Sequence, residues 1–314
     1  MNKRVYGIIG ISSILSNWNA DFSGYPKTLS DGTTFGSDKA LKYPMKKMWE
    51  DQGEKVLYIK SFKLSTEKKG GVNLVPRTLS ERYEYLFNVP DLENTSAKEI
   101  LENLFCAIDV KNFGATFAAK KKNISITGAV QIGQGLNFYA DTNPEEQQIL
   151  SPFRDGTKDK KEDSEEAKNS TLGTKIVSNE AHYFYPFVVN PLAYKEYQEL
   201  GVTDGYTEDD YAKFKVVALK SATAFATNAK IGCENEFALF VETDPDVYLP
   251  NLSAYMEFEK GEEKNTIGFS IGGLLNSLQN QIQKVEIYYN PNTTEIKTDV
   301  ENVKQYHIFT QKEV

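Results

Sequence analysis

Short segments rich in Val, Ile, Tyr and Phe are spread along the whole chain of 314 residues. Each is bounded by Gly, Pro or Asn, which are typical at strand ends, and each is therefore predicted to be a β-strand. The predicted strands are Val5–Ile11, Val56–Leu64, Ile124–Ile132, Tyr183–Val189, Glu236–Glu242, Thr266–Ile271 and Val285–Tyr289. Because helical patterns interleave with them, the chain is constrained to a mixed architecture of sheet and helices.

Three helices are predicted between these strands. Ser96 and Glu99 have the spacing of a capping box before an apolar helical stripe. Thr207 precedes three acidic residues and a second helix, and Leu274–Ile282 is the third candidate. This order of elements predicts an α+β sandwich in which helices cover one face of the sheet.

Two stretches are predicted to be excursions from that core. The smaller is Glu67–Arg77, with glycines, lysines and a proline, and the larger spans about residues 149–177. Within the larger one, Asp159–Glu166 is almost entirely charged and cannot bury a core. Strand-like residues flank this run, so a protruding hairpin is the natural structure.

Several classes of function find little support in the composition. His182 and His307 are the only histidines, Cys106 and Cys233 have no metal-ligand spacing, and no nucleophilic triad is indicated. Two cysteines indicate a reducing cytoplasm, and no stretch is long enough to span a membrane. Asp21 is the least generic acid, and a loop-shaping role is the favoured interpretation.

A local basic patch lies on this acidic chain of net charge -8. The segment Phe35–Trp49 contains Lys39, Lys42, Lys46 and Lys47 against one aspartate, which suggests an anion site. If a regular helix starts at Pro44, Lys46 and Lys47 lie in its first turn, and a bound phosphate would offset their unfavourable place in the helix dipole. A solvated lysine face is the alternative interpretation.

Six segments together resemble the backbone subunit of type I-B CRISPR surveillance complexes (Cascade), a member of the repeat-associated RNA-binding superfamily. The resemblance covers essentially the whole chain in collinear order. The segments that carry it are Gly7–Ser13, Asn17–Asp21, Phe35–Lys42, Asp109–Phe117, Ile126–Gly135 and Cys233–Leu239.

The resemblance implies an RRM-like (ferredoxin-like) palm, elaborated within a single domain of residues 1–314 by inserted fingers, web and thumb hairpin. It implies a non-catalytic subunit whose copies multimerise head-to-tail along a CRISPR RNA and support pairing of the guide with target DNA. The implied partners are the CRISPR RNA, target DNA, further copies of the chain, other Cascade subunits and a recruited nuclease-helicase. No cofactor is implied.

The resemblance also assigns residues. It maps Lys42 and Lys46, with Lys39 and Lys47 nearby, to the palm helix that grips RNA phosphates. It places Gln131 and Gln134 beside the RNA path and Lys175 in the thumb.

Two other functions are alternatives at this stage. One is a metal-dependent RNA endonuclease of the same superfamily that uses Asp21, and the other is an ordinary cytosolic enzyme with an acidic active site. Cleavage of complementary RNA in the presence of magnesium would distinguish the first.

Overall fold

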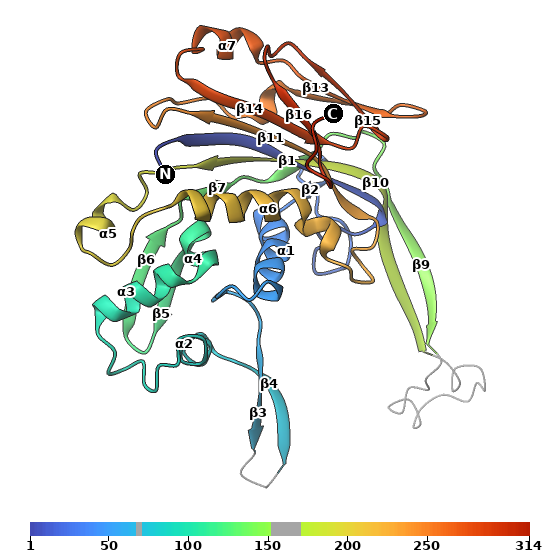
Figure 1. The fold of residues 1–314 in the computed structure, drawn as a ribbon. Coiled ribbons are helices and arrows are strands. Elements are labelled where there is room, and N and C mark those ends of the chain that lie inside the picture. The colour runs from blue at the N-terminus through green and yellow to red at the C-terminus, as the bar shows by residue number, and fades with distance from the viewer. Residues whose placement is uncertain (67–70, 152–170) are drawn as a thin grey trace, which may run out of the picture.

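The computed structural model describes residues 1–66, 71–151 and 171–314, without the side chains of Ser151, Thr171 and Leu172. Its centre is a nine-stranded sheet (Figure 1). The main path runs β16-β14-β11-β1-β10-β8-β2, and β7 and β9 also pair with β10. These strands are β1 (Arg4–Ser16), β2 (Phe35–Gly36), β7 (Val130–Ile132), β8 (Gly135–Asn137), β9 (Pro144–Ser151), β10 (Thr171–Val189), β11 (Cys233–Thr243), β14 (Ile282–Tyr289) and β16 (Lys304–His307).

β1 lies at the middle of the sheet, antiparallel to both β10 and β11. Ile9 faces Tyr185 in one neighbour and Ala238 in the other. Along the chain the central elements follow as β1, α1 (Asp38–Asp51), β8, β10, α6 (Glu208–Ala224) and β11, while in space their strands lie in the order β11-β1-β10-β8. The two helices thus form crossovers between strands of the antiparallel centre of the sheet, whose edge strand β16 pairs with β14 in parallel.

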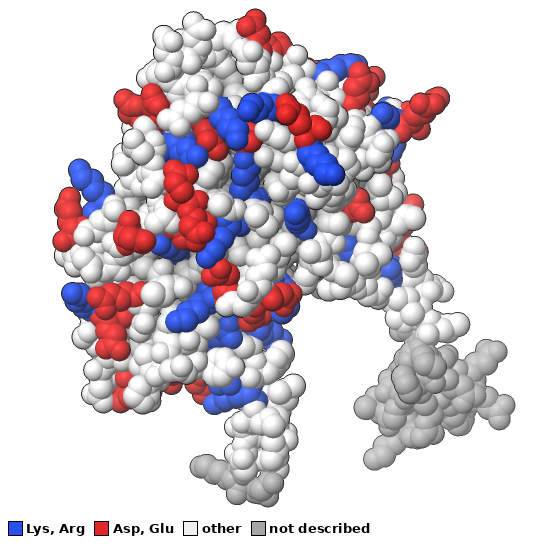
Figure 2. Space-filling model, in the orientation of Figure 1, with Lys and Arg blue, Asp and Glu red and all other residues white. Residues whose placement is uncertain are grey.

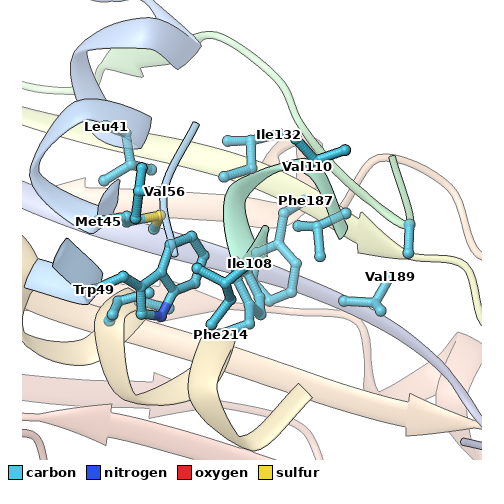
Figure 3. Close-up of a cluster of buried hydrophobic side chains, with 14 of the residues drawn as sticks. Leu41, Met45, Trp49, Val56, Ile108, Val110, Ile132, Phe187, Val189 and Phe214 are labelled. Atoms are coloured by element: carbon cyan, nitrogen blue, oxygen red, sulfur yellow. The ribbon is translucent and has the colours of Figure 1, made fainter. Parts of the chain in front are cut away.

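The two faces of the central sheet have different covers. α1, α4 (Ile108–Phe113) and α6 pack on one face, where Leu41, Met45, Trp49 and Phe214 are fully buried (Figure 3). The other face is covered by a small sheet of β12 (Met256–Glu259), β13 (Asn265–Phe269) and β15 (Thr294–Thr298), with the 3-10 helix η1 (Leu252–Tyr255) and α7 (Gly272–Ser277). The α+β class is therefore confirmed, but both faces are covered, one by helices and one by strands.

The remaining elements lie at the periphery on the helical side (Figure 1). Two hairpins pair β3 (Phe62–Thr66) with β4 (Val72–Pro76), and β5 (Gly114–Ala119) with β6 (Lys122–Thr127). The short helices are α2 (Leu79–Phe87), α3 (Ala97–Cys106) and α5 (Lys195–Glu199). No helix within the described residues is both long and apolar enough to cross a membrane.

Two projections extend from this body, the β3–β4 hairpin and the β9–β10 hairpin, and an open hollow separates them (Figures 1 and 2). In the second, Pro144–Ser151 pairs with Thr171–Ser178. These hairpins overlap in sequence with the two predicted excursions, of which residues 67–70 and the run Asp159–Glu166 lie outside the described residues.

Several local predictions are wrong. The predicted single strand Ile124–Ile132 is two strands, β6 and β7, which belong to different sheets, and between them the N–H of Ala129 donates to the hydroxyl of Tyr194 instead of to a strand. The predicted strand Val56–Leu64 is irregular up to Ser61, because the N–H groups of Leu57 and Tyr58 donate to the carboxylate of Asp109 instead of to a neighbouring strand. The third helix is α7, which begins at Gly272 and ends at Ser277, short of the predicted Ile282. The other two predicted helices are present, and the reciprocal capping box forms at Thr207 with Asp210.

Candidate nucleic-acid interface

The start of α1 is fixed against the edge of the central sheet. β2 pairs with β8 so that Gly36 faces Gly135. Gly36 has no room for a side chain, since a Cβ there would lie 1.8 Å from the hydroxyl of Tyr185. That hydroxyl also accepts a 2.5 Å hydrogen bond from Nε1 of Trp18. The buried hydrogen bond between Trp18 and Tyr185 therefore packs against Gly36, the residue just before the N-cap Ser37, and fixes where α1 begins.

α1 begins at Asp38 rather than at Pro44, which corrects the expected helix start. The Ser37 hydroxyl caps it by accepting from the N–H of Ala40, and Asp38 supplies a favourable negative charge in the first turn. Pro44 lies inside the helix and costs one backbone hydrogen bond. Burial of the stripe Leu41, Met45 and Trp49 holds the helix together across this gap.

Lys39 and Lys42 therefore occupy the first two turns of the helix, while Lys46 and Lys47 lie beyond Pro44. Lys39 is exposed and has no acidic partner among the described residues. Lys42 forms a 2.8 Å ion pair with Asp38, and its ammonium lies 5.2 Å from the ring centre of Phe113. A cation with no partner at a positive helix end is available to an anion.

Lys46 is turned toward the interior. Its Nζ donates to the carbonyl of Tyr58 at 3.3 Å and lies 3.8 Å from the carboxylate of Asp109. Asp109 is fully buried, and burial raises its pKa despite Lys46 and the two backbone N–H donors. The pKa of Lys46 is lowered, because the cost of burying its ammonium outweighs the attraction of Asp109. This pair ties α1 to α4 and to the irregular segment that precedes β3.

Lys47 points elsewhere and forms exposed ion pairs with Glu50 at 3.1 Å and Asp51 at 2.8 Å. These hydrogen-bonded carboxylates raise its pKa. The four lysines of the basic segment thus have four different environments, although Lys39, Lys42 and Lys46 have the i, i+3, i+7 spacing of one helical stripe. Only the ammonium of Lys39 among the four lacks a carboxylate partner in the described part of the chain.

Gln131 lies in β7 and Gln134 lies in the glycine-rich stretch after it, between Gly133 and Gly135, and both side chains are exposed. Gln131 donates through Nε2 to the carbonyl of Gly128 at 2.8 Å. Gln134 directly precedes Gly135, which pairs with Gly36, so it lies at the sheet edge where α1 begins. The structure therefore brings Gln134 to the same edge as the α1 start.

Lys175 belongs to a separate region. It lies on the β9–β10 hairpin opposite Gln147, and its side chain is partly exposed. The hairpin projects away from the body that carries α1 (Figure 1). Lys175 can therefore contact a ligand only where that ligand also reaches the hairpin.

Asp21 has the structural role favoured from the sequence. Its Oδ1 accepts from the backbone N–H groups of Ser23 at 2.8 Å and Tyr25 at 3.0 Å, which shapes the loop between β1 and β2. Across residues 1–66, 71–151 and 171–314, no group of three or more His, Cys, Asp and Glu residues could hold a metal ion.

Two residues that build this region were not predicted from the sequence. Asp109 organises the segment before β3, and Lys230 donates to the carbonyl of Asn17 at 2.6 Å and to that of Trp18. Burial lowers the pKa of Lys230. Neither has a local signal, because their partners lie at least 51 positions away along the chain. On the face shown in Figure 2, blue and red side chains are interspersed, so this face is not uniformly basic.

The sequence profile of the family described as "CRISPR-associated protein Cas7" matches residues 3–270. This chain belongs to the Cas7 family. The match confirms the CRISPR-associated family expected from the six sequence segments. The matched span of this Cas7-family chain includes α1, the glycine-rich stretch and the β9–β10 hairpin.

This Cas7-family protein was also compared with curated proteins and with solved structures. No curated protein matches it significantly. Among solved structures, a similar chain is described as "CRISPR RNA-guided surveillance complex, pre-nicking", with 16% sequence identity and a TM-score of 0.48, over 95% of this chain and 96% of that chain.

Proposed function

We propose that this Cas7-family protein is a non-catalytic CRISPR RNA-binding backbone subunit of a type I-B interference complex. Copies multimerise head-to-tail along the guide RNA and support its pairing with target DNA. In this proposal the RNA-binding palm has the RRM-like order β11-β1-β10-β8 with α1 and α6, and the β9–β10 hairpin is the thumb. The family match and the sequence segments shared with type I-B subunits support it.

The single observation that carries RNA binding is the start of α1. Lys39, an exposed lysine without a carboxylate partner among the described residues, lies one turn before Lys42 in the first two turns of a 14-residue helix. The helix dipole is positive at this end, and phosphates are the anions that every nucleotide offers. Contacts of this kind bind RNA without reading its sequence, as a guide-binding subunit requires.

The other assigned residues have supporting roles in this proposal. Gln134, at the same edge as the α1 start, and Gln131 hydrogen-bond the RNA backbone. Lys47 reaches phosphate by exchanging its exposed carboxylate partners, and Lys46 holds α1 in place from its inner side. Lys175 contacts RNA bound by the adjacent copy. The neighbouring Cascade subunits and a nuclease-helicase complete the cytoplasmic complex, and the chain itself needs no cofactor.

The test is the double variant Lys39→Ala with Lys42→Ala. We expect weaker binding of CRISPR RNA and a salt dependence of log affinity that is shallower by about 1.4, from about 0.7 per phosphate contact on single strands. Filter binding over a range of salt concentrations measures both.

The matched control is Lys98→Ala with Lys195→Ala, which changes the net charge equally on exposed helical positions away from α1. It should retain the wild-type slope. An equal slope in wild-type protein and the α1 variant would overturn the proposed interface. Complementary RNA incubated with the assembly and magnesium should also stay intact, and cuts that disappear in Asp21→Ala would contradict a non-catalytic role.

A further inference from the structure

Cationic and aromatic side chains alternate from α1 to the base of the β3–β4 hairpin. The ammonium of Lys46 lies 5.6 Å from the ring centre of Tyr58, and that of Lys60 lies 4.9 Å from the ring centre of Phe62. Tyr58 and Lys60 lie in the irregular segment before β3, and Phe62 is the first residue of β3. Tyr58, Lys60 and Phe62 thus follow one another as a row along the chain, and Lys46 of α1 contacts this row at Tyr58.

The end of this row is open to solvent. Phe62 is 47% exposed, and it shares its face of the hairpin with Leu64 and, across the strand pair, with Leu74 and Val72, which are all more exposed still. The opposite face is used internally, since Lys63 forms an ion pair with Glu81 of α2. One face of the hairpin is therefore anchored to the body and the other is free for a ligand.

The charge of the hairpin favours an anion over an apolar partner. Its described residues, 60–66 and 71–77, include Lys60, Lys63 and Arg77 and no carboxylate, in a chain of net charge -8. Arg77 adds a second cation over an exposed ring, 4.2 Å from the centre of Tyr85. Exposed rings beside cations are the features with which proteins bind single-stranded nucleic acid, through base stacking and phosphate contacts.

We propose that Tyr58, Lys60 and Phe62 form a second contact for single-stranded nucleic acid, which extends the path from α1 onto the β3–β4 hairpin. Lys60 contacts a phosphate and a base stacks on the exposed ring of Phe62. Tyr58 stays fixed, because its hydroxyl donates to the carbonyl of Thr116 at 2.8 Å, and it lines the connection. The inference rests on the proposed function but concerns different residues.

The test compares two single variants that remove different parts of the contact. Phe62→Ala should weaken binding by about 5- to 150-fold with an unchanged salt slope, since stacking contributes about 1–3 kcal/mol per base. Lys60→Ala should make the slope shallower by about 0.7. The probes are oligo(U) RNA and oligo(dT) DNA, titrated by fluorescence anisotropy at several salt concentrations.

Two controls keep the result interpretable. Leu74→Ala removes apolar area from the same face without removing a ring, and it should bind as wild type. Phe62→Leu keeps an apolar side chain and should lose affinity as Phe62→Ala does, which excludes unfolding as the cause. A loss with both probes supports the shared chemistry, a loss with RNA alone assigns the contact to the guide, and a loss with DNA alone assigns it to the target strand.

Unchanged affinity in the Phe62 and Lys60 variants would overturn the inference. If Lys39→Ala with Lys42→Ala still weakened binding in that case, the proposed function would stand. If Phe62→Ala and Leu74→Ala instead impaired assembly of copies equally while short probes bound normally, the face would be a protein contact and the inference would be wrong.

Discussion

Two buried sites of ionisable side chains lie next to the elements that carry the candidate RNA contacts, one beneath α1 and one at the base of the β9–β10 hairpin. They differ in the number of charged partners around the central group. Beneath α1, Lys46 lies 3.8 Å from the buried carboxylate of Asp109. At the base of the β9–β10 hairpin, His182 is only 1% exposed and contacts Glu236 through Nδ1 and Glu180 through Nε2, both at 2.8 Å. The first site has one cation and one carboxylate, and the second has one imidazole between two carboxylates.

The pKa shifts in the two sites have opposite directions. Burial opposes the charged form in both, and in the first it prevails, so the pKa of Asp109 is raised and that of Lys46 is lowered. In the second, Glu236 and Glu180 outweigh burial and raise the pKa of His182. Glu180 is also 2.6 Å from Lys260, and His182 and Lys260 outweigh burial to lower its pKa.

The comparison teaches that burial alone does not decide whether a charge is retained. Desolvation penalises each ion, and close hydrogen-bonded partners offset it only when there are enough of them. The imidazole has a carboxylate at each nitrogen and also stacks on Phe258 at 4.1 Å between ring centres. We therefore expect the two sites to respond differently to substitution and to pH.

The largest effect is expected for Lys46→Met. This substitution leaves Asp109 buried without a countercharge, so the free energy of unfolding should fall by about 3 kcal/mol at neutral pH. Because burial already raises the pKa of Asp109, its carboxyl can protonate as the pH falls, and the loss should shrink toward pH 5. Urea unfolding at both pH values measures the difference.

The matched control for this prediction is Lys47→Met, on the same helix. Its partners Glu50 and Asp51 are exposed enough that the pairs contribute little, within about 0.5 kcal/mol. An equal loss in the Lys46 and Lys47 variants would remove the distinction between an inward and an outward lysine on α1.

A smaller effect, spread over pH, is expected at His182. Its folded-state pKa is raised, so its contribution to stability is fully present below the unfolded pKa of about 6.5 and is lost as pH rises through the folded pKa. In that window one proton changes the free energy of unfolding by at most about 1.4 kcal/mol per pH unit. His182→Gln should flatten this part of the pH profile, measured by chemical unfolding between pH 6 and 9.

His307→Gln is the control, because His307 makes none of these carboxylate contacts. It should keep the wild-type profile. If His182→Gln also kept it, the two carboxylates would not hold a charged imidazole, and the contrast with Asp109 would fail.

Much of the architecture is determined by the sequence itself. Strands β1, β10, β11 and β14 follow from runs of Val, Ile, Tyr and Phe, and α6 follows from the capping residues Thr207 and Asp210. Leu41, Met45 and Trp49 have the i, i+4, i+8 spacing of one apolar helical stripe, and they form the buried face of α1. These features depend on neighbours within a few residues, so local periodicity and capping chemistry are enough to specify them.

Only the tertiary structure decided which lysines remain available and where α1 begins. Lys42 and Lys46 have the i, i+4 spacing of one helical stripe, yet Asp109, which is distant in sequence, turns Lys46 inward. The same carboxylate accepts from the N–H groups of Leu57 and Tyr58, which are irregular where a strand was predicted. Tertiary packing likewise carries α1 through Pro44. Partners more than 50 positions apart leave no periodic trace in the sequence, because only the folded chain brings their atoms into contact.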